Sequence, residues 1–125
     1  MICGIGIDIV RVDRIAQAMA RHGCRFTDRI FTASERSYCQ SHKRVTESFA
    51  ARFAVKEAAF KALGRGWDEC GGFTSVEVLR ASSGCPSILF SGLAERFFRD
   101  MGAVSAFVSI THDAGLAAAV VVLER

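Results

Sequence analysis

The feature that most constrains this chain of 125 residues is an uninterrupted helix-forming run in its middle, from Ser48 to Leu63. Ala, Lys, Glu, Arg and Leu are common in it and Gly and Pro are absent, so it predicts one long helix that Gly64 ends. Three phenylalanines mark one side at helical spacing, and alanines cover much of the rest: Phe49, Phe53, Phe60, Ala50, Ala51, Ala54, Ala58 and Ala62. A helix that is apolar nearly all round is a buried helix, so we expect the remaining elements to pack around it.

Four charged side chains interrupt this apolar surface: Arg52, Lys56, Glu57 and Lys61. Buried charges need partners, because an unpaired one costs several kcal/mol. Glu57 and Lys61 stand one turn apart on the same face, flanked by small alanines. They fit either an exposed intrahelical salt bridge, worth roughly 0.3–0.5 kcal/mol, or a site that a ligand approaches closely.

A further unusual charge lies near the N-terminus, where residues 2–10 alternate as a strand. One face of this strand carries isoleucines and the other carries glycines and an aspartate: Ile5, Ile7 and Ile9 against Gly4, Gly6, Asp8 and Val10. Glycine in a strand often marks the close approach of a ligand or of another backbone. Asp8 therefore either caps the following turn or supplies an oxygen ligand to a hard cation.

The rest of the chain predicts short helices followed by strands. Asp13 is a plausible N-cap for the first helix, residues 32–35 form a capping box for the second, and Leu93 begins the apolar side of the last. We expect helices over 14–22, 33–40 and 92–101, and strands over 74–79, 87–90, 106–111 and 116–123. This order predicts one α+β domain over residues 1–125, with a mainly antiparallel sheet wrapped on the long central helix.

Composition narrows the class of protein. Half of the residues are hydrophobic, which excludes disorder, and a net charge of +3 is too weak to indicate nucleic acid. The cysteines are odd in number, scattered and without a CxxC pair, so we expect reduced thiols in a cytoplasmic protein: Cys3, Cys24, Cys39, Cys70 and Cys85. No signal peptide and no membrane-spanning stretch is recognisable, and we expect no membrane partner.

Arginines crowd the first thirty residues: Arg11, Arg14, Arg21, Arg25 and Arg29. This basic face suits an acidic partner, although a solvated helix face has the same pattern. Other basic residues could contact phosphates beside Asp8, Glu57 and Lys61: Lys43, Arg44, Arg52, Arg65 and His112. Two carboxylates with phosphate oxygens suit Mg²⁺, but no Walker or Rossmann motif is present, so spacing alone indicates such a site only weakly.

Three motifs in this order carry a resemblance that covers nearly the whole chain. They are Gly-Ile-Gly-Ile-Asp-Ile at residues 4–9, Arg-Phe-Ala-Val-Lys-Glu-Ala at 52–58 followed by Lys61, and Ser-Ile-Thr-His at 109–112. A Gly-Cys-Pro turn at 84–86 adds to them. The chain thereby resembles the holo-[acyl-carrier-protein] synthases, the short bacterial type of 4'-phosphopantetheinyl transferase.

The resemblance implies transfer of the phosphopantetheine group of coenzyme A to a serine of apo acyl carrier protein, in fatty acid biosynthesis. Adenosine 3',5'-bisphosphate leaves. The resemblance also implies a homotrimer with sites between subunits, Mg²⁺ on Asp8 and Glu57, and Lys61 beside the reacting phosphate. The sequence leaves open whether Glu57 or a water takes the serine proton.

The same resemblance assigns two larger sets of residues. Implied contacts with coenzyme A are Lys43, Arg44, Arg52, Gly64, Gly66, Pro86, Thr111 and His112. Implied contacts with the acidic carrier protein are Arg14, Met19, Arg21, Arg25 and Phe26. Residues 67–74 depart from the family pattern.

The alternative class is a non-catalytic α+β module whose basic first helix binds an acidic protein or RNA. The chain lacks the aromatic stacking platforms and the Lys/Arg-Gly-aromatic runs of RNA-binding sheets. We therefore expect no nucleic-acid partner.

Overall fold

The computed structural model describes residues 1–125, and its central element is the 19-residue helix α4 (Val45–Leu63). Gly64 ends α4 in the left-handed conformation, with φ 70°, as the sequence predicts. Most side chains of α4 are buried, including the charged Arg52 and Lys56. The prediction of a buried central helix is therefore confirmed, and the helix begins slightly earlier than expected.

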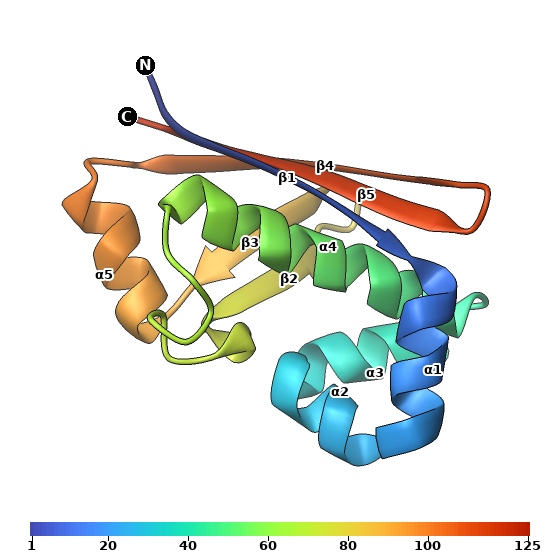
Figure 1. The fold of residues 1–125 in the computed structure, drawn as a ribbon. Coiled ribbons are helices and arrows are strands. Elements are labelled where there is room, and N and C mark those ends of the chain that lie inside the picture. The colour runs from blue at the N-terminus through green and yellow to red at the C-terminus, as the bar shows by residue number, and fades with distance from the viewer.

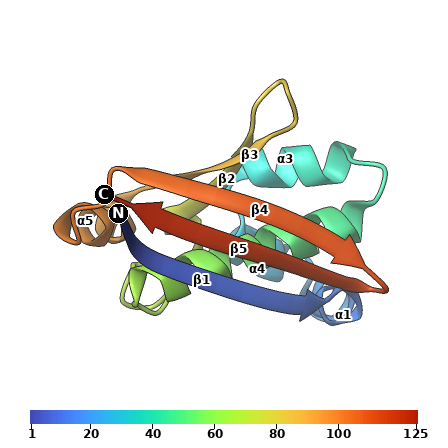
Figure 2. The same ribbon diagram turned by 90° about the horizontal axis from the view of Figure 1, so that it is seen from above.

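An antiparallel sheet in the order β1–β5–β4 covers one side of α4 (Figure 1). Its strands are β1 (Ile2–Arg11), β4 (Ser105–Asp113) and β5 (Leu116–Glu124). β4 and β5 form a hairpin whose two loop residues, Ala114 and Gly115, both have positive φ, as a tight hairpin turn requires. β1 pairs with β5, so the two chain termini lie side by side at one end of the sheet (Figure 2).

The glycines of β1 let this strand lie directly against the backbone of α4. A Cβ atom at Gly6 would stand 1.9 Å from the carbonyl oxygen of Ala58, and one at Gly4 would stand 2.3 Å from that of Ala62. The glycine face therefore marks the approach of another backbone. This contact brings Asp8, on the same face of β1, close to the charged side chains of α4.

The outer face of the sheet has no element of the same chain packed on it (Figures 1 and 2). Ile5, Ile7 and Ile9 are 64%, 67% and 62% exposed, and the strand register sets them beside outward residues of β5 such as Val120. β5 alternates between buried and partly exposed residues. One face of β5 is therefore left uncovered within a single chain.

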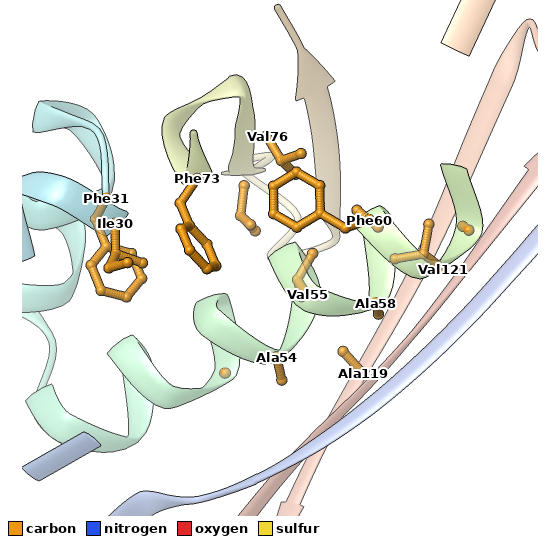
Figure 3. Packing of buried hydrophobic residues seen from close by; sticks show 14 of the residues in the cluster. Ile30, Phe31, Ala54, Val55, Ala58, Phe60, Phe73, Val76, Ala119 and Val121 are labelled. Carbon is orange, nitrogen blue, oxygen red and sulfur yellow. The ribbon is translucent and has the colours of Figure 1, made fainter. Parts of the chain in front are cut away.

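The opposite side of α4 is covered by a second, two-stranded antiparallel sheet and by short helices. These elements are α3 (Ala33–Ser41), the 3₁₀ turn η1 (Phe73–Ser75), β2 (Val76–Arg80), β3 (Pro86–Phe90) and α5 (Gly92–Asp100). Figure 3 shows Phe60 and Val55 packing toward Phe73 and Val76 on this side, while Ala54 faces the three-stranded sheet. The expected α+β fold is confirmed, with its antiparallel strands divided between two sheets.

Two helices at the N-terminal end of α4, α1 (Val12–His22) and α2 (Cys24–Ile30), complete the fold (Figure 1). The capping box that begins α3 is present, since the Thr32 side chain accepts from the Glu35 backbone and Glu35 accepts from Thr32. The prediction that Asp13 caps the first helix is wrong, because α1 follows β1 directly and has no side-chain cap.

Two other local expectations are corrected. The strand predicted from residue 74 begins at Val76, because residues 73–75 form η1. Leu93 is 44% exposed, since the orientation of α5 buries Ala94 instead.

All five cysteines are free thiols, as expected. None of the helices combines the length and the apolar character that crossing a lipid bilayer requires.

Candidate active site

β1 and the C-terminal half of α4 bring Asp8, Glu57 and Lys61 together beside the edge strand of the three-stranded sheet. Lys61 Nζ lies 3.2 Å from Asp8 Oδ1 and donates a hydrogen bond of 3.0 Å to the backbone carbonyl of Ile7. Lys61 on α4 thus pairs with a residue of β1. The interpretation of Glu57 and Lys61 as an intrahelical salt bridge is therefore wrong. The Lys61 side chain remains 55% exposed, which leaves its charge accessible to a ligand.

Glu57 is the member of this group whose charge has no ion-pair partner. Burial raises the pKa of its carboxyl above the ordinary value and the neighbouring Asp8 raises it further, while Lys61 and Arg14 oppose the shift. None of the ion pairs in the structure includes Glu57. Two carboxylates thus share one lysine, and a bound cation would relieve their repulsion.

The donor set of this group fits Mg²⁺. Mg²⁺ takes one or two protein carboxylates and fills its other positions with water and phosphate oxygens. Asp8 and Glu57 supply two carboxylates, and no cluster of three or more His, Cys, Asp or Glu side chains arranged for a metal occurs in the structure. The remaining ligands would therefore come from a substrate and from solvent.

A second basic cluster surrounds the N-terminal half of α4, and Arg52 is its centre. Arg52 is only 2% exposed, and its guanidinium carbon lies 4.0 Å from the ring centroid of Tyr38. Its Nε has no hydrogen-bond partner, and it takes part in none of the ion pairs. A buried cation without a counter-ion is costly, so this arrangement favours an anionic ligand.

Two more predicted coenzyme-binding residues meet Arg52. Arg44 and His112 line the same cavity of about 80 Å³, together with Tyr38 and Arg80. His112 comes from the end of β4, and Arg44 precedes α4. The fold therefore gathers three of the predicted residues from separate parts of the chain.

The other predicted coenzyme contacts are more scattered. Lys43 is exposed beside Arg44 in the connection before α4, Pro86 begins β3, and the loop after α4 contains Gly64 and Gly66. Thr111 lies on the outer face of the three-stranded sheet, opposite to His112. The structure does not bring Thr111 into the Arg52 cluster of the same chain.

The Arg52 cluster and the Asp8–Glu57–Lys61 group lie at different places along α4. The nine residues from Arg52 to Lys61 correspond to roughly 14 Å along a helix. One chain therefore holds a carboxylate–lysine group and a separate anion-binding cluster.

The predicted carrier-protein contacts lie on α1 and α2. Three are exposed arginines and two are partly buried apolar residues: Arg14, Arg21 and Arg25, and Met19 and Phe26. Arg14 and Arg21 border a hollow of about 600 Å³. Arg25 and Phe26 border another of about 500 Å³, where Arg29 lies over the Trp67 ring at 5.5 Å. These contacts thus form a basic surface with hollows.

The sequence analysis missed the partner of Lys56. Lys56 Nζ lies 2.8 Å from Glu35 Oε1, and both side chains are fully buried. Lys56 also donates to the backbone carbonyls of Phe73 and Val76, while Glu35 accepts from the Val78 amide at 2.8 Å. Desolvation lowers the pKa of Lys56, although Glu35 opposes this. This pair joins α3, α4 and β2, and the only signal in the sequence was a charge embedded in an apolar helix.

Tyr38 and Arg80, which enclose Arg52, were also not foreseen. Neither belongs to a motif, and they come from α3 and from the end of β2. Only the packing of these elements against α4 brings them to Arg52.

The chain is similar over nearly its whole length to proteins of one family. Residues 4–121 match the 4'-phosphopantetheinyl transferase superfamily. A holo-[acyl-carrier-protein] synthase of Koribacter versatilis (strain Ellin345) is 48% identical over 126 residues, which cover 99% of this chain and 99% of that protein.

Solved structures agree with this similarity. The crystal structure of holo-[acyl-carrier-protein] synthase from Neisseria meningitidis superposes with a TM-score of 0.92 at 29% identity, covering 100% of both chains. The Helicobacter pylori holo-[acyl-carrier-protein] synthase in complex with coenzyme A has a TM-score of 0.84 at 34% identity, covering 96% of this chain and 99% of that one.

Proposed function

The chain belongs to the 4'-phosphopantetheinyl transferase superfamily, and we propose that it carries out the reaction of a holo-[acyl-carrier-protein] synthase. In this reaction the 4'-phosphopantetheine group of coenzyme A passes to a serine of apo acyl carrier protein. The observation that carries the proposal is the group of Asp8, Glu57 and Lys61, in which two carboxylates and one accessible lysine meet between β1 and α4.

The residues of this group suit the chemistry of the transfer. The serine hydroxyl attacks the β-phosphate of coenzyme A, and the bond to the departing adenosine 3',5'-bisphosphate breaks. Lys61, held by Asp8 and the Ile7 carbonyl, is positioned to neutralise charge on the transferring phosphate. Glu57, whose pKa is raised by burial and by Asp8, takes the serine proton directly or through a water.

Asp8 and Glu57 would hold Mg²⁺, and the coenzyme diphosphate and water would complete its ligands. When bound, the ion supplies positive charge to the phosphate oxygens of the reacting group. The pKa of Glu57, which burial raises and the neighbouring Asp8 raises further, supports this assignment, because a cation would stabilise the charged form of both carboxylates.

The rest of coenzyme A would lie against the Arg52 cluster of a neighbouring subunit. Two observations support this: the separation of the two clusters along α4, and the exposed apolar outer face of the sheet. A homotrimer that buries this face would complete each site with residues from two copies. Thr111, on the outer face, would then come close to the shared site.

The basic surface of α1 and α2 suits the acidic acyl carrier protein as the second substrate. We infer a carrier protein of fatty acid biosynthesis, and the five free thiols agree with a cytoplasmic enzyme. Residues 1–125 would form a single transferase domain.

The test is to incubate the protein with apo carrier protein, coenzyme A and Mg²⁺ and to read the carrier by intact mass. We expect the carrier to gain one phosphopantetheine group, and to gain none when coenzyme A is omitted or a chelator is added. A carrier that binds but keeps its mass would instead indicate the non-catalytic binding module.

A further inference from the structure

Lys61 is joined to β1 by contacts that a ligand can replace. Its ammonium group lies 3.2 Å from Asp8 Oδ1 and donates a hydrogen bond of 3.0 Å to the Ile7 carbonyl. Both acceptors belong to β1 and Lys61 belongs to α4, so a rotation of the lysine side chain breaks both contacts without moving a backbone. The side chain is 55% exposed, and ion pairs this accessible contribute little to stability. Lys61 can therefore leave Asp8 when another anion competes for it.

This lysine is the one cation within ion-pair distance of the two carboxylates. None of the other ion pairs in the structure includes Asp8 or Glu57. Arg14 acts on Glu57 through its charge alone, since it lowers the Glu57 pKa, which burial and Asp8 raise, but makes no ion pair with it. Only 17% of the Asp8 side chain is exposed, so a second cation must reach this carboxylate beside Lys61. Like charges at such a distance repel each other.

Lys61 and a metal ion thus compete for one carboxylate, whereas both attract phosphate. Asp8 and Glu57 would hold Mg²⁺, and the diphosphate of coenzyme A offers oxygens that accept charge-assisted hydrogen bonds from an ammonium group. If the ammonium group turns to the diphosphate, Asp8 loses its positive neighbour and its affinity for a metal ion rises.

We infer that Lys61 exchanges Asp8 for the diphosphate of coenzyme A, and that this exchange makes metal binding by Asp8 and Glu57 depend on the coenzyme. The inference rests on the proposed function for the identity of the ligand. It predicts that coenzyme A increases the affinity for the metal ion in two ways, by contacts between the diphosphate and the ion and by the release of Asp8. A variant without the ammonium group separates these two contributions, because only the second one needs Lys61.

The experiment measures the binding of Mn²⁺ by electron paramagnetic resonance, with and without coenzyme A. Wild-type protein, Lys61→Met and the control Arg96→Gln are titrated, and a titration without protein corrects for Mn²⁺ held by the coenzyme itself. Arg96→Gln removes the same charge from an exposed position of α5 that takes part in no ion pair. The thermal midpoints of all three proteins are compared first, to establish that each is folded.

Without coenzyme A, we expect Lys61→Met to bind Mn²⁺ at least about tenfold more tightly than the wild type, a difference of about 1.4 kcal/mol. Arg96→Gln should match the wild type. Coenzyme A should then increase the Mn²⁺ affinity of Lys61→Met by a smaller factor than that of the wild type. Adding Asp8→Asn to Lys61→Met should abolish the gain, which would assign it to this carboxylate.

Three results would overturn the inference. One is that Lys61→Met binds Mn²⁺ no more tightly than the wild type without coenzyme A. Another is an equal effect of coenzyme A in the two proteins, since Lys61 would then repel the ion without changing its partner. The third is a gain in affinity that persists in the double variant.

The inference and the proposed function fail in different ways. If the carrier gains no mass but Lys61→Met shows both changes in Mn²⁺ binding, the transferase proposal fails and the exchange stands. If wild-type protein modifies the carrier but Lys61→Met binds Mn²⁺ no more tightly, the transferase proposal stands and the exchange is wrong.

Discussion

Lys56 and Glu57 are neighbours in the sequence, yet they lie on two faces of α4 that use charge in opposite ways. Lys56 is fully buried, and Glu35 with two backbone carbonyls satisfies its ammonium group. Glu57 is partly exposed, takes part in no ion pair and shares Lys61 with Asp8. A buried charge with a complete set of partners holds the fold together, whereas an accessible charge without one marks a place for a ligand.

Arg52 refines this comparison, because it lies one turn before Lys56 and is almost as deeply buried. It has the Tyr38 ring beside it but no ion-pair partner. Burial alone therefore does not separate structural charges from ligand-binding ones. The presence or absence of a counter-ion does.

The largest expected effect comes from removing Lys56, the buried charge that has a complete set of partners. Lys56→Met leaves Glu35 buried without its cation, so we expect the free energy of unfolding to fall by about 3–5 kcal/mol. Denaturant unfolding measures the loss. A double variant, Lys56→Met with Glu35→Leu, should recover part of it, although the amide of Val78 then loses its acceptor. If Lys56→Met unfolds like the wild type, the pair has no structural role.

The next effect, smaller in free energy than that of Lys56→Met, is expected from a charge placed in the proposed contact between subunits. Val120→Asp places a carboxylate on the outer face of the sheet, and leaving it unsatisfied in a subunit contact should cost about 1–3 kcal/mol per contact. We expect the proposed trimer to dissociate and the transferase activity to disappear together, as light scattering and an assay of the same fractions would show.

The control for this variant is Val104→Asp, which changes a residue that is 75% exposed outside the strands. It should leave both assembly and activity unchanged. An active monomer of Val120→Asp would end the idea of a shared site.

The sequence was sufficient for features that repeat along the chain or act locally. The helix before Gly64, the alternation of β1, the capping box at Thr32 and the last two strands each depend on residues a few positions apart. The cap at Asp13 failed because β1 runs directly into α1, so the helix starts before the residue that was expected to cap it.

Contacts between distant elements could not be derived in the same way. The partner of Lys61 is Asp8, which lies on β1 and not on the same helix, and the partner of Lys56 is Glu35 on α3. Helical spacing suggested Glu57 as the partner of Lys61, and only the packing of β1 on α4 decides otherwise. The suggestion that Asp8 and Glu57 act together came from the motifs, and the pKa of Glu57 is raised first by burial and then by the neighbouring Asp8.

The accessible charges on α1 offer a smaller effect that depends on salt. Arg21→Glu should raise the KM for the carrier protein by roughly one order of magnitude at low salt, while the binding of coenzyme A is unchanged. The difference should shrink as the Debye length falls from about 10 Å at 0.1 M to about 3 Å at 1 M salt. Arg96→Glu is the matched control. A carrier KM of the wild type that does not depend on salt would contradict the role of the basic surface.

The smallest expected effect is on the pH dependence of stability. The folded state raises the pKa of Glu57 above its ordinary 4.5, so between these two values the folded protein binds more protons than the unfolded one. Stability therefore falls as the pH rises through this window. Glu57→Gln should lose this decline and have a higher thermal midpoint at neutral pH without divalent cations. An identical pH profile in the two proteins would show that burial and Asp8 do not destabilise the charged form of Glu57.

The central claim is that the charges between β1 and α4 carry out the transfer and do not hold the fold together. The most direct test uses one preparation of Glu57→Ala to measure the initial rate of carrier modification with Mg²⁺ and coenzyme A present, and the thermal midpoint with both of these ligands absent. The account predicts a rate at least about 100-fold below the wild type, at a midpoint that is unchanged or higher. A rate close to that of the wild type would contradict it.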